Sequence, residues 1–360
     1  MQADVSVVIP TWNRRTVLAR TVNSALAQRG VNVEVIVVDD GSADDTATAM
    51  GALADRGVRL IRHEQSVGVA DARNAGLAVA TAPWVAFLDD DDLWSPDKLR
   101  CQLDVAGTAR PDGSTPQWVC SDAVLIDQFD MLIGWAPAGG EEISLRDLLH
   151  VNTVPGGGSG VLVRRDLLDR AGGFDGRYFA SDWDMWIRFG LEGGAVAVAR
   201  QPLLAYRVWR TSADEARRKN TKTGHISSQF ERLGPAWQEV MATHGPAARQ
   251  LGASDDLTPM HRYVAYRAMY GRSFGLAAQS YREVARINHS RRAALLVQVV
   301  GVAGPALLPL WAWRNRRLVP AAVRQEAERW LGELGNSPSP VASINQQTAV
   351  SQPAAMAADH

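Results

Sequence analysis

Cysteine and net charge are both scarce in this sequence, and each scarcity excludes a class of protein. Cys101 and Cys120 are the only cysteines, too few for a disulfide framework and without zinc-site spacing, so we expect a reducing compartment. The formal net charge is only -1 over 360 residues, and no nucleic-acid-binding motif is present. We therefore expect no nucleic acid among the partners.

The first residues lack the basic segment and the apolar run of a secretory signal peptide, so we expect a cytoplasmic location. An apolar run from Val5 to Ile9 predicts a buried strand there instead. Hydrophobic residues make up 46% of the chain and charged residues 21%, which are ordinary values for a globular protein. The length leaves room for two domains, or for one large domain with an appendage.

The most informative stretch is a run of four aspartates, Asp89 to Asp92, directly after an apolar run from Trp84 to Leu88. Such an apolar run is typical of a buried parallel strand, and ligands bind beyond the carboxyl ends of these strands. Adjacent carboxylates repel one another unless a cation neutralises them. A solvated acidic turn is the alternative, but this arrangement after a strand favours a metal–phosphate site for Mg²⁺ or Mn²⁺.

Strand-like and helix-like segments alternate up to about residue 210, which predicts an α/β fold with a mostly parallel central sheet. Three strands are followed by polar loops, which should lie together because the carboxyl ends of parallel strands meet at one edge. Ser42 and Asp45 have the spacing of a capping box for a helix that reaches about Arg56. The predicted strands are Val5–Ile9, Val33–Val38, Val58–Ile61, Trp84–Leu88, Trp118–Ile126 and Val161–Arg164; the polar loops are Pro10–Asn13, Asp39–Ser42 and Asp89–Asp92.

Two aspartates further along are predicted to occupy opposite sides of one helix. If a helix begins at Asp182, the apolar residues Met185 and Trp186 share its face. A carboxylate there would have a raised pKa and could act as a general base; a helix N-cap is the alternative. Asp184 falls on the other side, four residues before Arg188, and we expect it to be a solvated residue in a helix-surface ion pair.

Five segments in order resemble the inverting, family 2 type glycosyltransferases of the GT-A fold. Each motif alone is weak, but five at the proper spacing are specific. The resemblance implies a nucleotide-diphospho-sugar transferase fold, a nucleoside-diphosphate sugar donor, a divalent metal and direct displacement at the anomeric carbon. The segments are Val5–Asn13, Val37–Ser42, Ala72–Gly76, Phe87–Asp92, and Gly173–Asp175 with Asp182–Trp186.

The same resemblance implies roles for individual residues. Asp182 matches the catalytic base, and Asp89 and Asp91 match the metal-binding Asp-x-Asp motif. Arg73 could reach the donor pocket or simply brace its helix. The full set of donor-binding residues that we expect is Pro10, Thr11, Asn13, Asp39, Asp40, Arg73 and Asp90, with Asp39 and Asp40 receiving the base and ribose.

Two positions depart from the family pattern. Ser181 stands where the family usually has a glutamate before the base, so one helper carboxylate is missing. Trp209 stands where the family often has a histidine that completes the metal or phosphate site, and tryptophan cannot ligate a metal. The ion would then depend on phosphate and water, or Trp209 would pack on the donor. A glycine-rich run, Pro155 to Gly160, fits either a plain turn or a mobile loop near a ligand.

The α/β alternation stops after residue 212, and we expect a helical appendage over residues 213–335 and a disordered tail over 336–360. Helices are predicted for 227–244, 259–288 and 320–334. The uncharged stretch from Ala293 to Trp313 is flanked by arginines and ends in tryptophans. For it we expect contact with a membrane surface first, a packed soluble helix second and a membrane span third.

The predicted function is metal-dependent, inverting transfer of a sugar to a glycan or lipid-linked acceptor, at the inner face of a membrane. Surface glycan or glycolipid synthesis is the expected setting. One alternative is a nucleotidyltransferase of sugar-nucleotide synthesis, which would normally have a Gly-rich, basic loop where this chain has Pro10–Asn13. The other is a non-catalytic glycosyltransferase-like binding protein, a reading that Ser181 and Trp209 favour.

Overall fold

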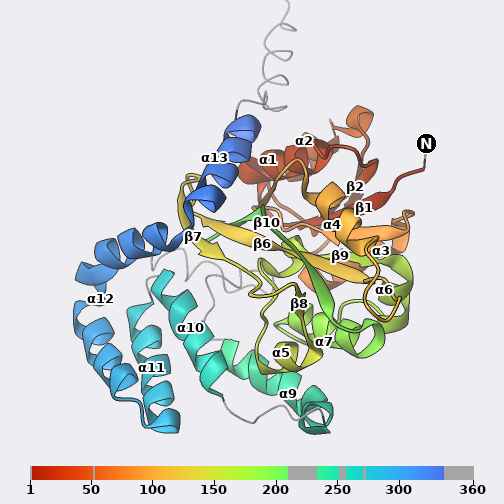
Figure 1. Ribbon diagram of the computed structural model, residues 1–360. Helices are drawn as coiled ribbons and strands as arrows, with labels where there is room; N and C mark the ends of the chain where they lie inside the picture. The colour runs from red at the N-terminus through yellow and green to blue at the C-terminus, as the bar shows by residue number, and fades with distance from the viewer. Residues whose placement is uncertain (1, 52, 210–232, 251–256, 271–272, 336–360) are drawn as a thin grey trace, which may run out of the picture.

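The computed structural model describes residues 2–51, 53–209, 233–250, 257–270 and 273–335. The predicted tail over 336–360 lies outside these residues, as do residues 213–232 of the predicted helical appendage. A ten-stranded mixed sheet forms the centre of the α/β part, in the order β3-β2-β1-β4-β9-β6-β10-β5, with β7 beside β6 and β8 beside β10 (Figure 1). The strands are β1 Val5–Thr11, β2 Val33–Asp39, β3 Val58–Arg62, β4 Trp84–Phe87, β5 Leu93–Trp94, β6 Trp118–Ile126, β7 Leu132–Ala136, β8 Glu142–Ile143, β9 Leu162–Arg164 and β10 Val196–Arg207.

The pairing of the main strands confirms the predicted fold class. β1 pairs in parallel with both β2 and β4, and β2 pairs in parallel with β3. β9 is antiparallel to both β4 and β6, so β6 runs in the direction of β4, and β10 is parallel to β6. The carboxyl ends of β1, β2, β4, β6 and β10 therefore meet at one edge of the sheet.

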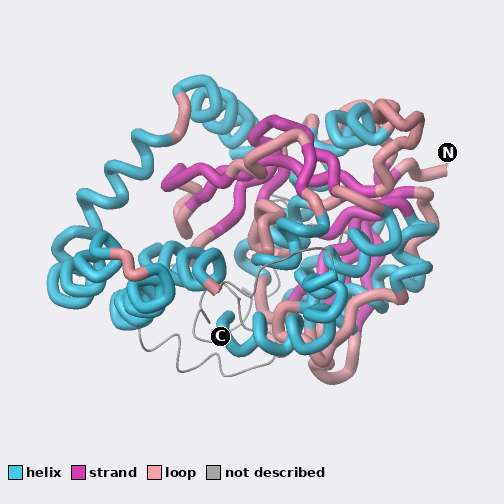
Figure 2. Tube along the Cα trace, turned by 60° about the horizontal axis from the view of Figure 1, so that its bottom comes forward, coloured by secondary structure: helices cyan, strands magenta, loops and turns pink. Residues whose placement is uncertain are grey.

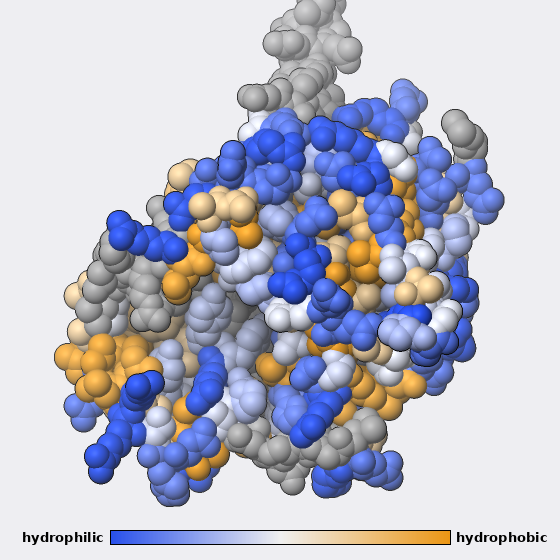
Figure 3. Space-filling view, in the orientation of Figure 1, coloured by the Kyte–Doolittle hydropathy of each residue, from blue (hydrophilic) through white to orange (hydrophobic). Residues whose placement is uncertain are grey.

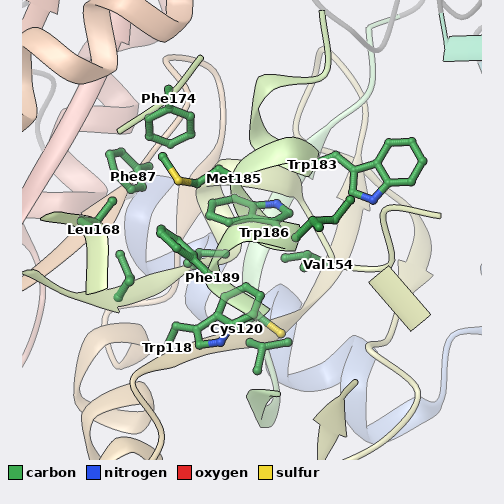
Figure 4. Packing of buried hydrophobic residues seen from close by; sticks show 14 of the residues in the cluster. Phe87, Trp118, Cys120, Val154, Leu168, Phe174, Trp183, Met185, Trp186 and Phe189 are labelled. Atoms are coloured by element: carbon green, nitrogen blue, oxygen red, sulfur yellow. The ribbon is translucent and has the colours of Figure 1, made fainter. Parts of the chain in front are cut away.

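Helices cover both faces of the sheet, which explains why its strands are apolar without alternation. Val8 and Phe87 face one side and pack with the helix that carries Trp186, while Ile9 and Leu88 face the other side. Figure 4 shows the aromatic centre of the first side, where Trp186 lies close to Trp118 and Phe189. The helices are α1 Arg15–Leu26, α2 Thr46–Gly51, α3 Val69–Val79, α4 Lys98–Ala106, α5 Leu145–His150, α6 Arg165–Ala171 and α7 Ser181–Gly193.

The predicted capping box at Ser42 is wrong. The helix α2 begins at Thr46, and its backbone N–H donates to Oδ1 of Asp44 at 3.0 Å. The Ser42 hydroxyl instead accepts from the backbone N–H of Asn13 at 2.9 Å. The helix ends at Gly51, well before Arg56, which lies in a short 3-10 turn. A contact with the neighbouring β1 loop thus overrides the local capping pattern.

The helical region returns to the α/β part at both ends. Ala236 and Val240 of α9 are buried in the core that contains Trp186, and Trp330 of α13 donates from Nε1 to the carbonyl of Pro202 at 3.0 Å. Figure 2 shows the helices between these two contacts standing to one side of the strands. The predicted helix over 259–288 is two helices. The helices are α9 Leu233–Gln250, α10 Thr258–Tyr270, α11 Phe274–Asn288, α12 Arg291–Leu318 and α13 Ala321–Gly335.

The uncharged stretch from Ala293 to Trp313 lies inside α12. It packs closely against α11 at Gly304, where a Cβ would come within 2.6 Å of the Phe274 ring. The outer side of the same helix exposes Leu295 and Val302, and Figure 3 shows hydrophobic surface over this part of the molecule. In the described ranges, no helix combines the length and apolarity needed to cross a bilayer.

Candidate active site

The aspartate loop between β4 and β5 is a fixed structure and not a solvated turn. Asp90, Asp91 and Asp92 are all buried. The backbone N–H of Arg207 donates to Oδ1 of Asp92 at 2.8 Å, and the Thr21 hydroxyl donates to the carbonyl of the same aspartate at 2.9 Å. Contacts from both α1 and β10 thus fix the aspartate loop at Asp92, at the carboxyl edge of the sheet.

Asp89 lies at the start of the loop and contacts Arg73 from α3. Nη2 of Arg73 donates to Oδ1 of Asp89 at 2.6 Å, and the guanidinium also lies 5.1 Å from the centre of the Phe174 ring. The backbone N–H of Asp89 donates to the hydroxyl of Ser159 at 2.9 Å. Arg73 therefore reaches the aspartate loop, and its contact with a donor stays a prediction.

Asp90 joins the aspartate loop to the end of β1. The Thr11 hydroxyl donates to Oδ2 of Asp90 at 2.8 Å, and the Arg14 side chain lies 4.0 Å from its other oxygen. Burial, followed by the charge of Asp91, raises the pKa of Asp90 to about 7. Two of the predicted donor-binding residues, Thr11 and Asp90, thus bind each other.

Trp209 contacts the predicted metal ligand directly. Its indole Nε1 donates to Oδ2 of Asp91 from the segment that follows β10. The tryptophan therefore orients the carboxylate that a histidine would accompany in the family pattern.

The donor set suits a divalent cation that also binds substrate phosphates. Among the residues that the structure describes, no group of three or more His, Cys, Asp and Glu side chains is arranged to hold a metal ion. Asp89 and Asp91 supply carboxylate oxygens at the edge of the sheet, and Mg²⁺ usually takes one or two carboxylates together with substrate phosphates. The chemistry of these residues therefore fits Mg²⁺ or Mn²⁺.

Asp182 lies in the first turn of α7 and is buried, as predicted. The residue that precedes the helix is Ala180, so the structure does not support the N-cap alternative for Asp182. Its Oδ2 accepts from the Asn152 side chain at 3.3 Å, and its Oδ1 accepts from the backbone N–H of Trp183 at 2.8 Å. Burial raises the pKa of Asp182, and the nearby charge of Arg73 partly opposes this shift.

The glycine-rich run forms a 3-10 turn, Gly157–Gly160, that lines the site. A Cβ at Gly157 would come within 2.9 Å of Oδ2 of Asp182, and this glycine has φ +54°. A Cβ at Gly158 would lie 3.0 Å from Nη2 of Arg73. Glycine is needed here because the backbone, Asp182 and Arg73 approach one another too closely for a further side chain.

The prediction that Asp184 is solvated is wrong, although its pairing with Arg188 is confirmed. Arg188 contacts Oδ2 of Asp184 at 2.7 Å, and Nε2 of His244 lies 2.8 Å from Oδ1. The side chain of Asp184 is only 2% exposed. It is buried because α9, which carries His244, covers the side of α7 that helical periodicity assigned to solvent.

Asn13 joins the loops that follow β1 and β2. It adopts the left-handed conformation with φ 54°, which asparagine tolerates better than most residues. Its side-chain oxygen accepts from the backbone N–H of Ala43 at 2.8 Å. Pro10 is buried within β1, where it pairs with Val38. Direct contact of Pro10 or Asn13 with a donor stays a prediction.

The neighbouring carboxylates of Asp39 and Asp40 have different surroundings. Asp40 accepts hydrogen bonds from His63 and from residues 66–68, at 2.7 to 3.0 Å. Burial opposes its ionisation, but these bonds outweigh burial and lower the pKa of Asp40. Asp39 accepts from the backbone N–H of Ser42 and lies 3.3 Å from Arg62. Asp40 therefore organises a loop, which leaves Asp39 as the stronger candidate for donor binding.

Comparison with known proteins agrees with this geometry. Residues 6–170 match the family described as Glycosyl transferase family 2. This region is a glycosyltransferase family 2 domain. The segment that carries Asp182 follows the matched region, so its role depends on geometry and on the resemblance of the local motif.

This chain aligns with its curated relatives over only part of their length. The chain is 45% identical over 106 residues to the succinoglycan biosynthesis protein ExoO of Rhizobium meliloti, covering 29% of this chain and 30% of that protein. It is 33% identical over 190 residues to an uncharacterized glycosyltransferase, alr2836, of Nostoc, covering 51% and 56%. It is 35% identical over 99 residues to WfgD of Escherichia coli, covering 28% and 39%. The chain thus spans less than two thirds of each relative.

The fold is also found in a solved structure. A crystal structure of Staphylococcus aureus TarS, residues 1–349, aligns with a TM-score of 0.51 and 16% identity, covering 89% of this chain and 92% of that chain. At this identity the likeness concerns the fold alone. It agrees with a GT-A type arrangement of the sheet and helices around the family 2 domain.

Sequence reasoning overlooked four residues around the site. Ser159 contacts the predicted metal-binding loop, and Asn152 contacts the predicted base. Arg207 positions Asp92, and His244 positions Asp184. The glycine run drew attention to the turn that holds Ser159, and Arg207 lies two residues before Trp209, the position that departs from the family pattern. Nothing local distinguishes Asn152 or His244, because their contacts lie 30 and 60 residues away along the chain.

Proposed function

We propose that this protein transfers a sugar from a nucleoside-diphosphate sugar to an acceptor hydroxyl, with inversion at the anomeric carbon. The observation that carries the proposal is the position of Arg73 between two carboxylates. It contacts Asp89 of the aspartate loop at 2.6 Å, and its charge partly opposes the rise that burial causes in the pKa of Asp182. A cation-binding loop for the leaving group and a base for the acceptor thus flank one arginine.

The nucleoside diphosphate would lie along the carboxyl edge of β1, β2 and β4. The loops of this edge are already joined, because Asn13 connects the β1 and β2 loops and Thr11 binds Asp90. Asp39 would receive hydrogen bonds from the base or the ribose, since a carboxylate accepts from both. Asp89 and Asp91 would hold Mg²⁺ or Mn²⁺, which when bound would neutralise the charge of the diphosphate.

Asp182 would accept the proton of the attacking hydroxyl. As the acceptor oxygen forms its bond to the anomeric carbon, the bond to the diphosphate breaks and its electron pair leaves with the diphosphate. The proton moves to a carboxylate whose pKa burial has raised, which makes Asp182 a stronger base than an exposed aspartate. Asn152 positions Oδ2, and the backbone of the glycine turn packs beside it.

For the acceptor we propose a lipid-linked or growing surface glycan. The name of WfgD describes transfer from UDP-Glc to GlcNAc-diphosphoundecaprenol, and that of ExoO describes succinoglycan biosynthesis. The outer side of α12 exposes Leu295 and Val302, next to Arg291 and Arg292 at the start of the helix. An apolar strip flanked by cations suits the surface of an anionic membrane.

The decisive experiment measures the release of free nucleoside diphosphate from sugar donors with Mn²⁺, with and without acceptor. We expect release that acceptor stimulates and that matches the amount of glycosylated product. A nucleotidyltransferase would instead form pyrophosphate from a nucleoside triphosphate and a sugar phosphate. A non-catalytic protein would bind, with about 2.7 kcal/mol of stabilisation at a hundred times the dissociation constant, and show no turnover. Either result would contradict the proposal.

A further inference from the structure

The turn between β6 and β7 exposes two large apolar side chains. Phe129 is 74% exposed and Met131 is 56% exposed, although both follow a strand that is buried throughout. Large apolar side chains normally pack against other apolar groups. Two exposed ones in the same turn therefore indicate a surface that binds a partner or a membrane.

Hydrogen bonds within the turn hold these side chains outward. Oδ1 of Asp127 accepts from the backbone N–H of Phe129 at 2.9 Å and from that of Met131 at 3.1 Å. The backbone N–H of Asp127 also donates to the carbonyl of Met131 at 3.0 Å, which closes the turn. Asp130 adopts φ 63° to complete it. The exposure therefore belongs to a closed turn and not to a loose loop.

One arginine ties this turn to the aspartate loop. Arg207 is buried, and it donates to the carbonyl of Asp91 from Nε and to the carbonyl of Asp127 from Nη1, both at 2.7 Å. Its Nη2 lies 2.6 Å from Oδ1 of Asp130. Because β6 and β10 are parallel, their carboxyl ends share the edge that carries the proposed active site. The two apolar side chains thus lie at this edge.

Arginine side chains lie beside the turn that carries the apolar pair. Arg20, with 40% of its side chain exposed, also pairs with Asp130, so two guanidinium groups share that carboxylate. The strand that leaves the turn, β7, contacts α12, the helix with the exposed apolar strip. The end of α12 exposes Arg317 and Leu318. This combination of large apolar side chains and arginines complements an anionic lipid surface.

We propose that the β6–β7 turn inserts Phe129 and Met131 into an anionic membrane leaflet and so turns the active-site edge toward the lipid. The benefit to catalysis rests on the proposed function, because a lipid-linked acceptor would then arrive from the same side. Insertion itself is independent of turnover and is measured without it.

The first test is co-sedimentation of the full chain with vesicles of equal parts phosphatidylglycerol and phosphatidylcholine. The double variant Phe129→Ser/Met131→Ser should lose about tenfold or more in binding, because membrane partition scales with buried apolar area. Leu191→Ser, which removes another exposed apolar side chain (48% exposed) on α7, is the matched control and should bind like the wild type. Wild-type binding by the double variant, or no binding by the wild type, would overturn the proposal.

The second test places a reporter in the turn. Cys101 and Cys120 are both buried, so Met131→Cys offers one exposed thiol for an environment-sensitive fluorophore. Its emission should shift to the blue with the vesicles, whereas a label at Thr115→Cys, before the opposite end of β6, should not respond. An unresponsive label at position 131 would overturn the proposal. A double variant that binds vesicles like the wild type, and loses only transfer to long-chain acceptors, would overturn it as well. Failure of sugar transfer would leave both readouts intact and count only against the proposed function.

Discussion

Nη2 of Arg73 donates to Oδ1 of Asp89 at 2.6 Å, and this contact places a buried cation between the aspartate loop and Asp182. The side chain of Arg73 is only 6% exposed. Its charge therefore acts at short range on carboxylates from two distant parts of the chain. The first two predictions follow from this arrangement.

Asp182→Asn keeps the size of the side chain but removes its capacity to take a proton at neutral pH. We expect kcat to fall by about 10²–10⁴-fold, the usual contribution of a general base, while stabilisation by nucleoside diphosphate stays unchanged. Steady-state turnover and thermal shift are the two measurements. Asp169→Asn on α6 alters a carboxylate that is 64% exposed and should leave both unchanged. Full turnover by Asp182→Asn would remove the base assignment.

The pH dependence of turnover should respond to Arg73. The base works when it is ionised, so kcat should fall as the pH drops through a pKa that burial has raised above the ordinary 3.8. Arg73→Met removes the charge that opposes this shift, and the acid limb should move to higher pH. Profiles of kcat against pH for both proteins provide the measurement. An acid limb that stays in place in Arg73→Met would contradict the proposed coupling.

Removal of the divalent cation should abolish transfer, and Mn²⁺ or Mg²⁺ should restore it. Asp91→Asn should raise the Mn²⁺ concentration required for half-maximal activity and lower kcat, because Mg²⁺-type ions bind through charged carboxylates. Isothermal titration with Mn²⁺ and donor checks the binding, and circular dichroism checks that the fold is retained. Full activity of Asp91→Asn in EDTA is the result that would refute the metal assignment.

Asp184→Asn should destabilise the protein although it lies outside the proposed chemistry. Asp184 is buried between Arg188 and His244, and loss of its charge leaves the arginine without its counter-ion. We expect a loss of about 3 kcal/mol in the free energy of unfolding, the size of a broken buried pair. Asp169→Asn, in an exposed pair with Arg165, should lose at most about 0.5 kcal/mol in the same urea denaturation. Equal losses would show that burial of Asp184 does not matter.

Lys98 should make stability depend on pH in a characteristic way. Its side chain is fully buried, with Nζ 2.7 Å from Oε1 of Gln102 and 4.2 Å from the centre of the Trp94 ring. Burial lowers the pKa of Lys98 from 10.5 to about 7. Above pH 7 the unfolded chain then holds a proton that the folded chain lacks, so stability rises with pH, by at most about 1.4 kcal/mol per unit.

The control for this prediction is Lys98→Met, which keeps the apolar stem and removes the titrating amine. Denaturant unfolding of both proteins between pH 7 and pH 9 gives the difference in the free energy of unfolding. The wild type should gain stability relative to the variant across this range. Parallel curves would mean that Lys98 keeps its proton in the folded protein.

The sequence by itself determined the α/β class, the shared edge of the strands and the aspartate loop at that edge. These features are local: a buried strand is a short apolar run, and the carboxylates of Asp89 to Asp92 follow it directly. The face of α7 that carries Asp182 was predicted for the same reason, since helical periodicity fixes which residues share a side. The short motifs also pointed to the family whose model matches residues 6–170.

Only the tertiary structure decided what surrounds these residues. Asp184 is buried because α9 covers it. Asp40 accepts hydrogen bonds from the loop between His63 and Gly68. Trp209 contacts Asp91 from 118 residues away. Each outcome depends on packing between segments far apart in the chain, which local periodicity does not encode. A carboxylate's role follows from its partners and its burial, and those are properties of the folded chain.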